Sequence, residues 1–95
     1  MLNGKQKRFL RAMANRLPAV FQIGKEGLSD NLFNSIDEAL KANELIKISV
    51  LKTCELTMNE IEVEICARCH CELVQQIGKT VVIYRRSRDN RIILP

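Results

Sequence analysis

A strand, a tight loop and a helix start follow one another in residues 19–29, which read AVFQIGKEGLS. The apolar run Ala19–Ile23 predicts a short strand that ends at Gly24. Ser29 is a good N-cap, and apolar residues then recur at helical spacing to about Asn43. A strand that leads directly into a capped helix indicates a sheet with helices packed on it.

The residues on either side of this unit predict five further elements. Residues 4–16 place Phe9, Leu10, Met13 and then Leu17 on one helical face with basic side chains opposite, so we expect an amphipathic helix that ends before Pro18. Residues 45–51 are rich in β-branched side chains and predict a strand. Residues 73–77 and 80–85 flank Gly78-Lys79, which is typical of a hairpin turn.

Residues 60–65 fit two patterns, because Glu60 to Ile65 alternate as a strand would and also complete a helical stripe. The capping box at Thr57–Glu60 favours the helix. The predicted order is therefore helix-strand-helix-strand-helix-strand-strand. We expect one α+β domain over residues 1–95, with helices and a mixed sheet in two layers.

The composition is that of an ordinary folded protein, with 46% hydrophobic and 27% charged residues among 95. No apolar run approaches the roughly 18 residues that a membrane span needs, and residues 1–8 lack the apolar core of a secretory signal. We therefore expect a cytoplasmic protein with reduced cysteines.

The net charge of +4 conceals a strong segregation of charge along the chain. Residues 1–25 hold six basic groups and no acid, and residues 79–95 hold five basic groups against Asp89. Residues 26–78 reverse the balance, with four basic and ten acidic groups. If the fold brings the two ends together, it will have one basic face suited to an anionic partner, and charge alone does not distinguish RNA from DNA or anionic lipid.

Gly24-Lys25-Glu26-Gly27 is the motif with the clearest chemistry. Two glycines allow positive φ and a close approach of a ligand to the backbone. The helix that begins after Ser29 would point its free N–H groups toward the loop, and Lys25 adds a positive charge. Such a site suits a phosphate, and GxxG loops clamp single-stranded nucleic acid in KH domains.

The chain also resembles the CRM domain (chloroplast RNA splicing and ribosome maturation), in the stand-alone bacterial form called the YhbY family. The similarity runs nearly from end to end, through Lys5-Gln6, Leu17-Pro18, Ile23-Gly24-Lys25, Gly27-Leu28-Ser29, Glu44–Ile48 and Gln76–Thr80. One departure is Cys69-His70-Cys71, where the family commonly ends its third helix with a Thr-Gly-Ala-like segment. His70 then occupies the place of a helix-ending glycine, which costs some strain.

This resemblance implies a four-stranded sheet, as in the C-terminal domain of translation initiation factor 3, and RNA binding through the glycine-rich loop. Bacterial members associate with precursors of the large ribosomal subunit, so ribosomal RNA or its precursor is the implied partner. The candidate RNA-binding residues are the loop and basic side chains carried over by position: Gly24, Lys25, Glu26, Gly27, Lys5, Lys7, Arg8, Arg11, Lys47, Arg85 and Arg86.

The cysteines suggest rival functions. Cys66-Ala67-Arg68-Cys69-His70 spells the attachment motif of c-type haem, but the predicted strands and the lack of an export signal argue against it. Cys54, Cys66, Cys69, His70 and Cys71 could supply zinc ligands, although paired CxxC knuckles are missing. A zinc-responsive or redox-responsive RNA binder is thus one alternative; packing of reduced thiols in the core is the simpler interpretation.

No catalytic constellation is present, since a lone His70 and three splayed acids form no acid–base pair. We expect a monomeric binding module without cofactor or metal. With one tyrosine and three phenylalanines, base stacking should contribute little, so phosphate contacts should dominate and sequence preference should be weak. A second alternative is a protein-interaction adaptor on the ribosome that uses the acidic stretch 55–64.

Overall fold

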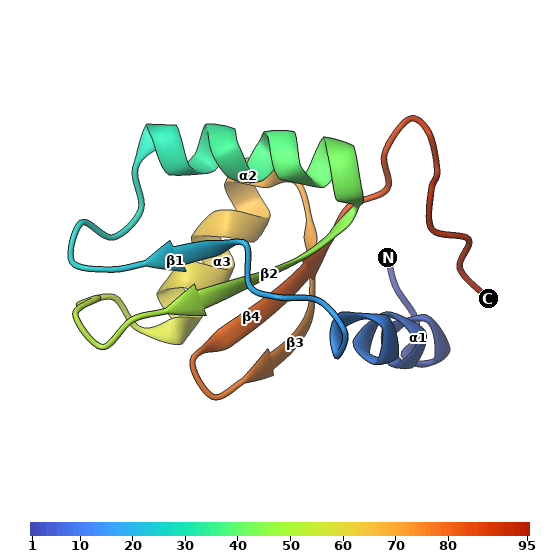
Figure 1. Ribbon diagram of the computed structural model, residues 1–95, viewed down its shortest axis with the longest axis horizontal. Helices are drawn as coiled ribbons and strands as arrows, with labels where there is room; N and C mark the ends of the chain where they lie inside the picture. Colours follow the sequence, from blue (N-terminus) through green and yellow to red (C-terminus); the bar gives the residue numbers. More distant parts are fainter.

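The computed structural model describes all 95 residues and contains three helices and four strands (Figure 1). In chain order they are α1 (Gly4–Ala14), β1 (Phe21–Ile23), α2 (Asp30–Asn43), β2 (Leu45–Val50), α3 (Met58–Cys69), β3 (Glu72–Ile77) and β4 (Thr80–Tyr84). The predicted order is confirmed. The ambiguous stretch is helical because the Thr57 hydroxyl accepts a hydrogen bond from the Glu60 amide at 3.1 Å and caps α3.

The four strands form one mixed sheet in the order β1-β2-β4-β3. β1 and β2 are parallel, and the other two pairs are antiparallel. The carboxyl ends of β1 and β2 therefore meet the β3–β4 turn at one end of the sheet. Two backbone hydrogen bonds join these segments: Leu51 N–H to the Ile23 carbonyl at 2.8 Å, and Val50 N–H to the Lys79 carbonyl at 2.7 Å.

The two faces of the sheet pack against different parts of the chain (Figure 1). Helices α2 and α3 cover one face, and their core includes Ile36, Ile48 and Ile65. Helix α1 and the C-terminal segment pack on the other face, around Leu10, Val82 and other side chains. The two chain ends thus come together, as Gln6 Nε2 also donates to the Pro95 carbonyl at 3.3 Å.

Two of the predicted helix caps are confirmed, and the predicted capping box is found at a different helix. Ser29 accepts from the Leu32 amide at 3.1 Å, as expected of an N-cap. His70 has φ +52° and ψ +47°, so it does adopt the left-handed conformation of the glycine it stands in for. The reciprocal capping box is not at Thr57 but at Asn3 and Gln6, where each side chain binds the other's amide.

The predicted apolar face of the first helix is only partly right. Leu10 is fully buried, but Phe9, Met13 and Leu17 are 40%, 37% and 36% exposed. The helix also ends at Ala14, before its predicted end at Arg16. Leu10 and Ala14 are the residues of α1 that are buried in the small core on this face, where Leu2 and Ile92 also pack. No helix is both long and apolar enough to cross a bilayer.

Candidate nucleic-acid interface

The GxxG loop is a tight turn closed by its own backbone. The Gly27 amide donates to the Gly24 carbonyl at 3.0 Å, which leaves Lys25 and Glu26 exposed at the tip. Gly27 has φ +66°, a conformation that favours glycine, whereas Gly24 is not in the left-handed region. Of the two glycines that could allow positive φ, Gly27 is the one that adopts it.

The loop and the start of α2 surround an open hollow of about 350 Å³. Its lining is almost entirely polar and consists of Gln22, Gly24, Lys25, Glu26, Gly27, Ser29 and Leu32. The positive end of the α2 dipole favours an anion here. Two acids, Glu26 in the hollow and Asp30 in the first helical turn, reduce that effect, so Lys25 is the main attraction for a phosphate.

Two neighbouring loops complete this end of the sheet. A Cβ added to Gly24 would lie 3.4 Å from Leu51 and Thr53, and one added to Gly27 would lie 3.4 Å from Leu56, so the GxxG loop packs against residues 51–56. Val50 links these residues to Lys79 through the 2.7 Å backbone hydrogen bond. We call residues 24–27, 51–56 and 78–79 together the loop end.

Lys25, Lys52 and Lys79 are all exposed on the loop end. Sequence reasoning missed Lys52 and Lys79, although a signal was available. Because β1 and β2 are parallel, the loops that follow them must lie at the same edge, and an antiparallel hairpin on β2 brings its turn there as well. The loop end therefore presents three lysines rather than one.

The basic residues of α1 lie elsewhere. Lys5, Lys7, Arg8 and Arg11 are at the opposite end of the long axis from the GxxG loop (Figure 1). Lys47 lies between these regions, because β2 turns Ile46 and Ile48 toward α2 and α3 and so places Lys47 on the other face of the sheet. The predicted residues of the loop and of α1 thus form two separate basic regions rather than one cluster, and Lys47 lies on the face of the sheet that α1 covers.

The side chain of Arg85, a candidate RNA-binding residue, is held inside the protein, unlike that of Arg86. Its guanidinium donates to the Asp37 carboxylate and to the Cys69 carbonyl, both at 2.7 Å, and only 19% of its side chain is exposed. The bond from Arg85 holds the pKa of Asp37 below its usual value. Arg85 therefore ties α2 and α3 to β4. Arg86 beside it is exposed, near Lys41 and Arg88.

The opposite layer of the molecule is acidic. Helices α2 and α3 carry six acids, namely Asp30, Asp37, Glu38, Glu60, Glu62 and Glu64, against two basic residues. One of these, Arg68, pairs with Asp30 at 3.2 Å and lies over the Phe33 ring at 4.4 Å. A polyanion would therefore be repelled by this layer and attracted to the side that carries α1 and Lys47.

Three of the four cysteines, Cys66, Cys69 and Cys71, lie at the C-terminal end of α3. No three His, Cys, Asp or Glu residues converge so as to hold a metal ion. The amide of Cys71 donates to the Cys66 carbonyl at 3.3 Å, which is the six-residue bond of a Schellman cap around His70. The thiol of Cys71 donates to the Ile65 carbonyl at 3.8 Å. Its interaction with the neighbouring Cys66 thiol, together with burial, raises the pKa of Cys71, and the same interaction lowers the pKa of Cys66. Cys69 is buried in the core, as predicted from its place in the apolar stripe.

Nearly the whole chain is similar to known proteins. The sequence model of the CRS1 / YhbY (CRM) domain matches residues 2–85. The "Probable RNA-binding protein YqeI" of Bacillus subtilis is 48% identical over 93 residues, which cover 98% of this chain and 97% of that one. An "RNA-binding protein" of Haemophilus influenzae is 36% identical, with 99% and 95% covered. The solution structure of SAV1595 from Staphylococcus aureus superposes over the full length of both chains, with a TM-score of 0.83 and 44% identity.

Proposed function

The chain belongs to the CRS1 / YhbY (CRM) domain family, and on that premise we propose that it binds RNA, specifically ribosomal RNA or its precursor during assembly of the large ribosomal subunit. Two relatives that match almost their full length are named as RNA-binding proteins, which supports RNA as the partner. The ribosomal part of the proposal rests on the resemblance to the bacterial stand-alone members.

The observation that carries the proposal is the loop end. It joins a glycine turn, the start of α2 and three exposed lysines from three different loops. A sugar-phosphate backbone could lie close to Gly24 while Lys25, Lys52 and Lys79 neutralise its phosphates. α1 and Lys47 would extend the contact along the same side of the sheet.

Phosphate contacts should supply most of the affinity. Phe33 and Tyr84 are buried, and Phe21 packs against the core, so Phe9 is the one aromatic ring with substantial exposure. About four phosphate contacts would give a slope of roughly −3 for log K against log salt on single-stranded RNA. Filter binding across a salt series measures this slope, and a slope near zero would exclude the mechanism.

The loop itself is tested by reversing one charge. Lys25→Glu should weaken RNA binding at least tenfold, since it replaces an attractive charge at the tip by a repulsive one. Lys41→Glu is the control, because it makes the same change in net charge on the exposed surface of α2; it also removes the ion pairs of Lys41 with Asp37 at 3.3 Å and Glu38 at 3.5 Å, so its stability is measured as well. Circular dichroism checks that both variants fold. Equal affinity of the two variants would remove the loop from the interface.

We further propose that the protein is a monomeric binding module in the cytoplasm and not an enzyme. Nuclease treatment distinguishes this proposal from the alternative of a protein-interaction adaptor. Association with ribosomal particles should disappear after nuclease treatment if RNA is the contact. Association that survives nuclease would favour the adaptor and its acidic stretch 55–64.

A further inference from the structure

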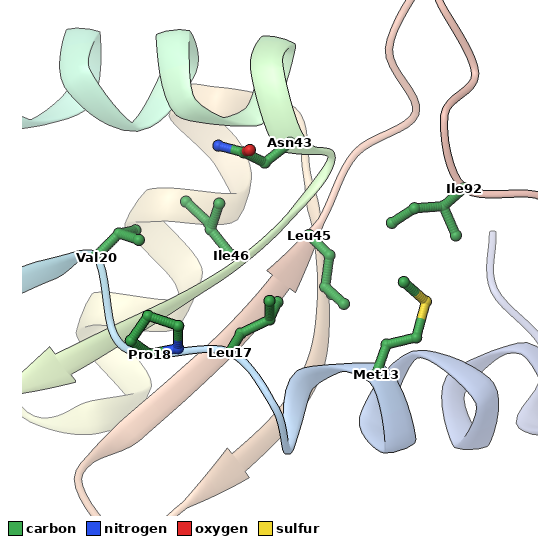
Figure 2. A pocket seen from close by; sticks show the side chains of 8 residues that line it. All are labelled: Met13, Leu17, Pro18, Val20, Asn43, Leu45, Ile46 and Ile92. Carbon is green, nitrogen blue, oxygen red and sulfur yellow. The ribbon is translucent and has the colours of Figure 1, made fainter.

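A second hollow, outside the loop end, lies beside the start of β2, where β1 no longer pairs with it. β1 pairs with Ile48–Val50, and the Val20 amide donates to the Lys47 carbonyl at 2.9 Å, so only Leu45 and Ile46 have no strand neighbour on that side. The chain between α1 and β1 turns away there and leaves a cavity of about 230 Å³ (Figure 2). Its lining comes from α1, the following linker, the end of α2, the start of β2 and the C-terminal segment: Met13, Leu17, Pro18, Val20, Asn43, Leu45, Ile46 and Ile92.

The cavity is apolar except for one amide. Six of its eight lining residues are hydrophobic, and Met13, Leu17 and Val20 expose 37%, 36% and 49% of their surface. Asn43 stands at its edge (Figure 2) and donates through Nδ2 to the Ala39 carbonyl at 3.2 Å. That bond fixes the side chain and leaves Oδ1 and one N–H free to accept and donate hydrogen bonds.

The surroundings of the cavity are basic. Arg16 lines an adjoining hollow that shares Met13 and Leu17 with the cavity, and no carboxylate lines either one. Lys47 lies on the same face of β2 as the lining residue Leu45, and Arg91, which precedes the lining residue Ile92, is exposed and pairs with Asp89 at 3.5 Å. The nearest acid in the sequence, Glu44, has a fully buried carboxylate that is satisfied by hydrogen bonds. The cavity therefore suits an apolar group that is attached to an anionic backbone.

We propose that this cavity receives one unpaired nucleobase of the bound RNA, with the Asn43 amide on the edge of the base and Arg16, Lys47 and Arg91 on the flanking phosphates. This rests on the proposed RNA-binding function. The volume suits a single ring system, because it is smaller than the roughly 300–1,000 Å³ of sites for drug-sized ligands. Apolar side chains hold extruded bases in other proteins, and an amide can donate to and accept from a base edge.

The test compares RNA with and without bases. Oligo(A), oligo(U) and oligo(C) of nine nucleotides are matched with a ribose-phosphate strand of equal length that lacks bases. The wild-type protein should bind at least one of the three about tenfold more tightly than the abasic strand, because a base in the cavity removes apolar surface from water and forms hydrogen bonds with the Asn43 amide. Asn43→Ala and Leu17→Ser should reduce this ratio toward one and leave abasic binding unchanged, since neither alters the charge.

Two control variants test whether losing any exposed amide or apolar side chain, rather than one in the cavity, changes the ratio. Asn34→Ala removes an exposed amide elsewhere on α2, and Val63→Ser removes an exposed apolar side chain from α3. Both should keep the wild-type ratio. As a direct readout, the methyl NMR signals of Met13, Leu17, Val20 and Ile92 should shift with the base-containing strands and not with the abasic strand.

The outcomes distinguish the two proposals. If all strands bind with strong salt dependence but the ratio is one, or the pocket variants do not change it, the nucleobase pocket is wrong and RNA binding stands. If no strand binds, both proposals fail. A pocket whose methyl signals respond instead to self-association of the protein, or to an added protein partner, and not to RNA also overturns the proposal.

Discussion

Glu44 is the one charged residue that the fold buries completely. It follows α2 with φ +67°, and its carboxylate accepts hydrogen bonds from the amides of Ser87, Arg91 and Ile92 at 2.8, 3.0 and 2.7 Å and from the Ser87 hydroxyl. Burial opposes ionisation, but the hydrogen bonds outweigh it and hold the pKa of Glu44 below its usual value. This carboxylate therefore anchors the C-terminal segment to the end of α2.

Glu44→Gln should lower the free energy of unfolding by about 2–4 kcal/mol, because an amide offers one acceptor oxygen where the carboxylate offers two, and its NH₂ group faces donors. Because the folded-state pKa is depressed, the stabilisation by the charge is complete above the ordinary pKa of 4.5 and is lost as pH falls through the lower folded-state value. Urea unfolding of both proteins between pH 3 and 7 measures this. A deficit that stays constant down to pH 3 would contradict the assignment.

Glu44 also shows the limit of sequence reasoning at this scale. The residue precedes the predicted strand 45–51 and in the structure caps α2 just before β2 begins at Leu45, but its burial could not be predicted. Its partners are backbone amides more than 40 residues away, and backbone donors leave no mark in a sequence. The same holds for Arg85, whose engagement with Asp37 and the Cys69 carbonyl depends on how two helices meet β4.

At the scale of elements, the unit β1–loop–α2 was the easiest to predict, because each of its signals is local. Ser29 caps the helix through an amide three residues away, and Gly27 closes a four-residue turn. The extent of α1 was harder to predict. Its apolar stripe is real, but which part of it is buried depends on Leu2 and Ile92, which reach the same core from the two ends of the chain.

The two loop glycines should respond differently to alanine. Gly27→Ala should cost about 1–2 kcal/mol of stability, because φ +66° is strained for a residue with a Cβ. Gly24→Ala should change stability by less than about 0.5 kcal/mol, since its backbone is not left-handed and its Cβ would meet side chains at 3.4 Å. If the backbone approaches RNA at Gly24, this variant should nevertheless bind RNA more weakly. Thermal unfolding together with RNA titration checks both; equal stability of the two variants would refute the difference in their roles.

At the scale of the whole molecule, charge is sorted by layer. The sequence showed basic ends and an acidic middle, and the structure brings both ends to one face of the sheet and puts the acidic helices on the other. The distance between α1 and the GxxG loop was not foreseeable, because the packing position of α1 is set by contacts far apart in the chain. The molecule is 37 Å long, and these two basic regions lie toward its opposite ends (Figure 1).

This separation predicts a dependence on RNA length. Arg8→Glu should weaken binding of an RNA long enough to follow the 37 Å axis and should scarcely affect a strand of three or four nucleotides held at the loop end. Lys25→Glu should weaken both. Fluorescence anisotropy with short and long strands measures the four affinities. Equal loss for Arg8→Glu at both lengths would mean that α1 acts only as a general positive charge.

The most direct test of the central claim is an amide NMR titration of the protein with single-stranded RNA. The account predicts that the largest shifts fall on Gly24–Gly27, Lys52 and Lys79, with further shifts in α1 when the RNA is long. The outer faces of α2 and α3 should stay unchanged. Shifts concentrated on α2 and α3, with the loop end silent, would contradict the claim that RNA is held at the loop end.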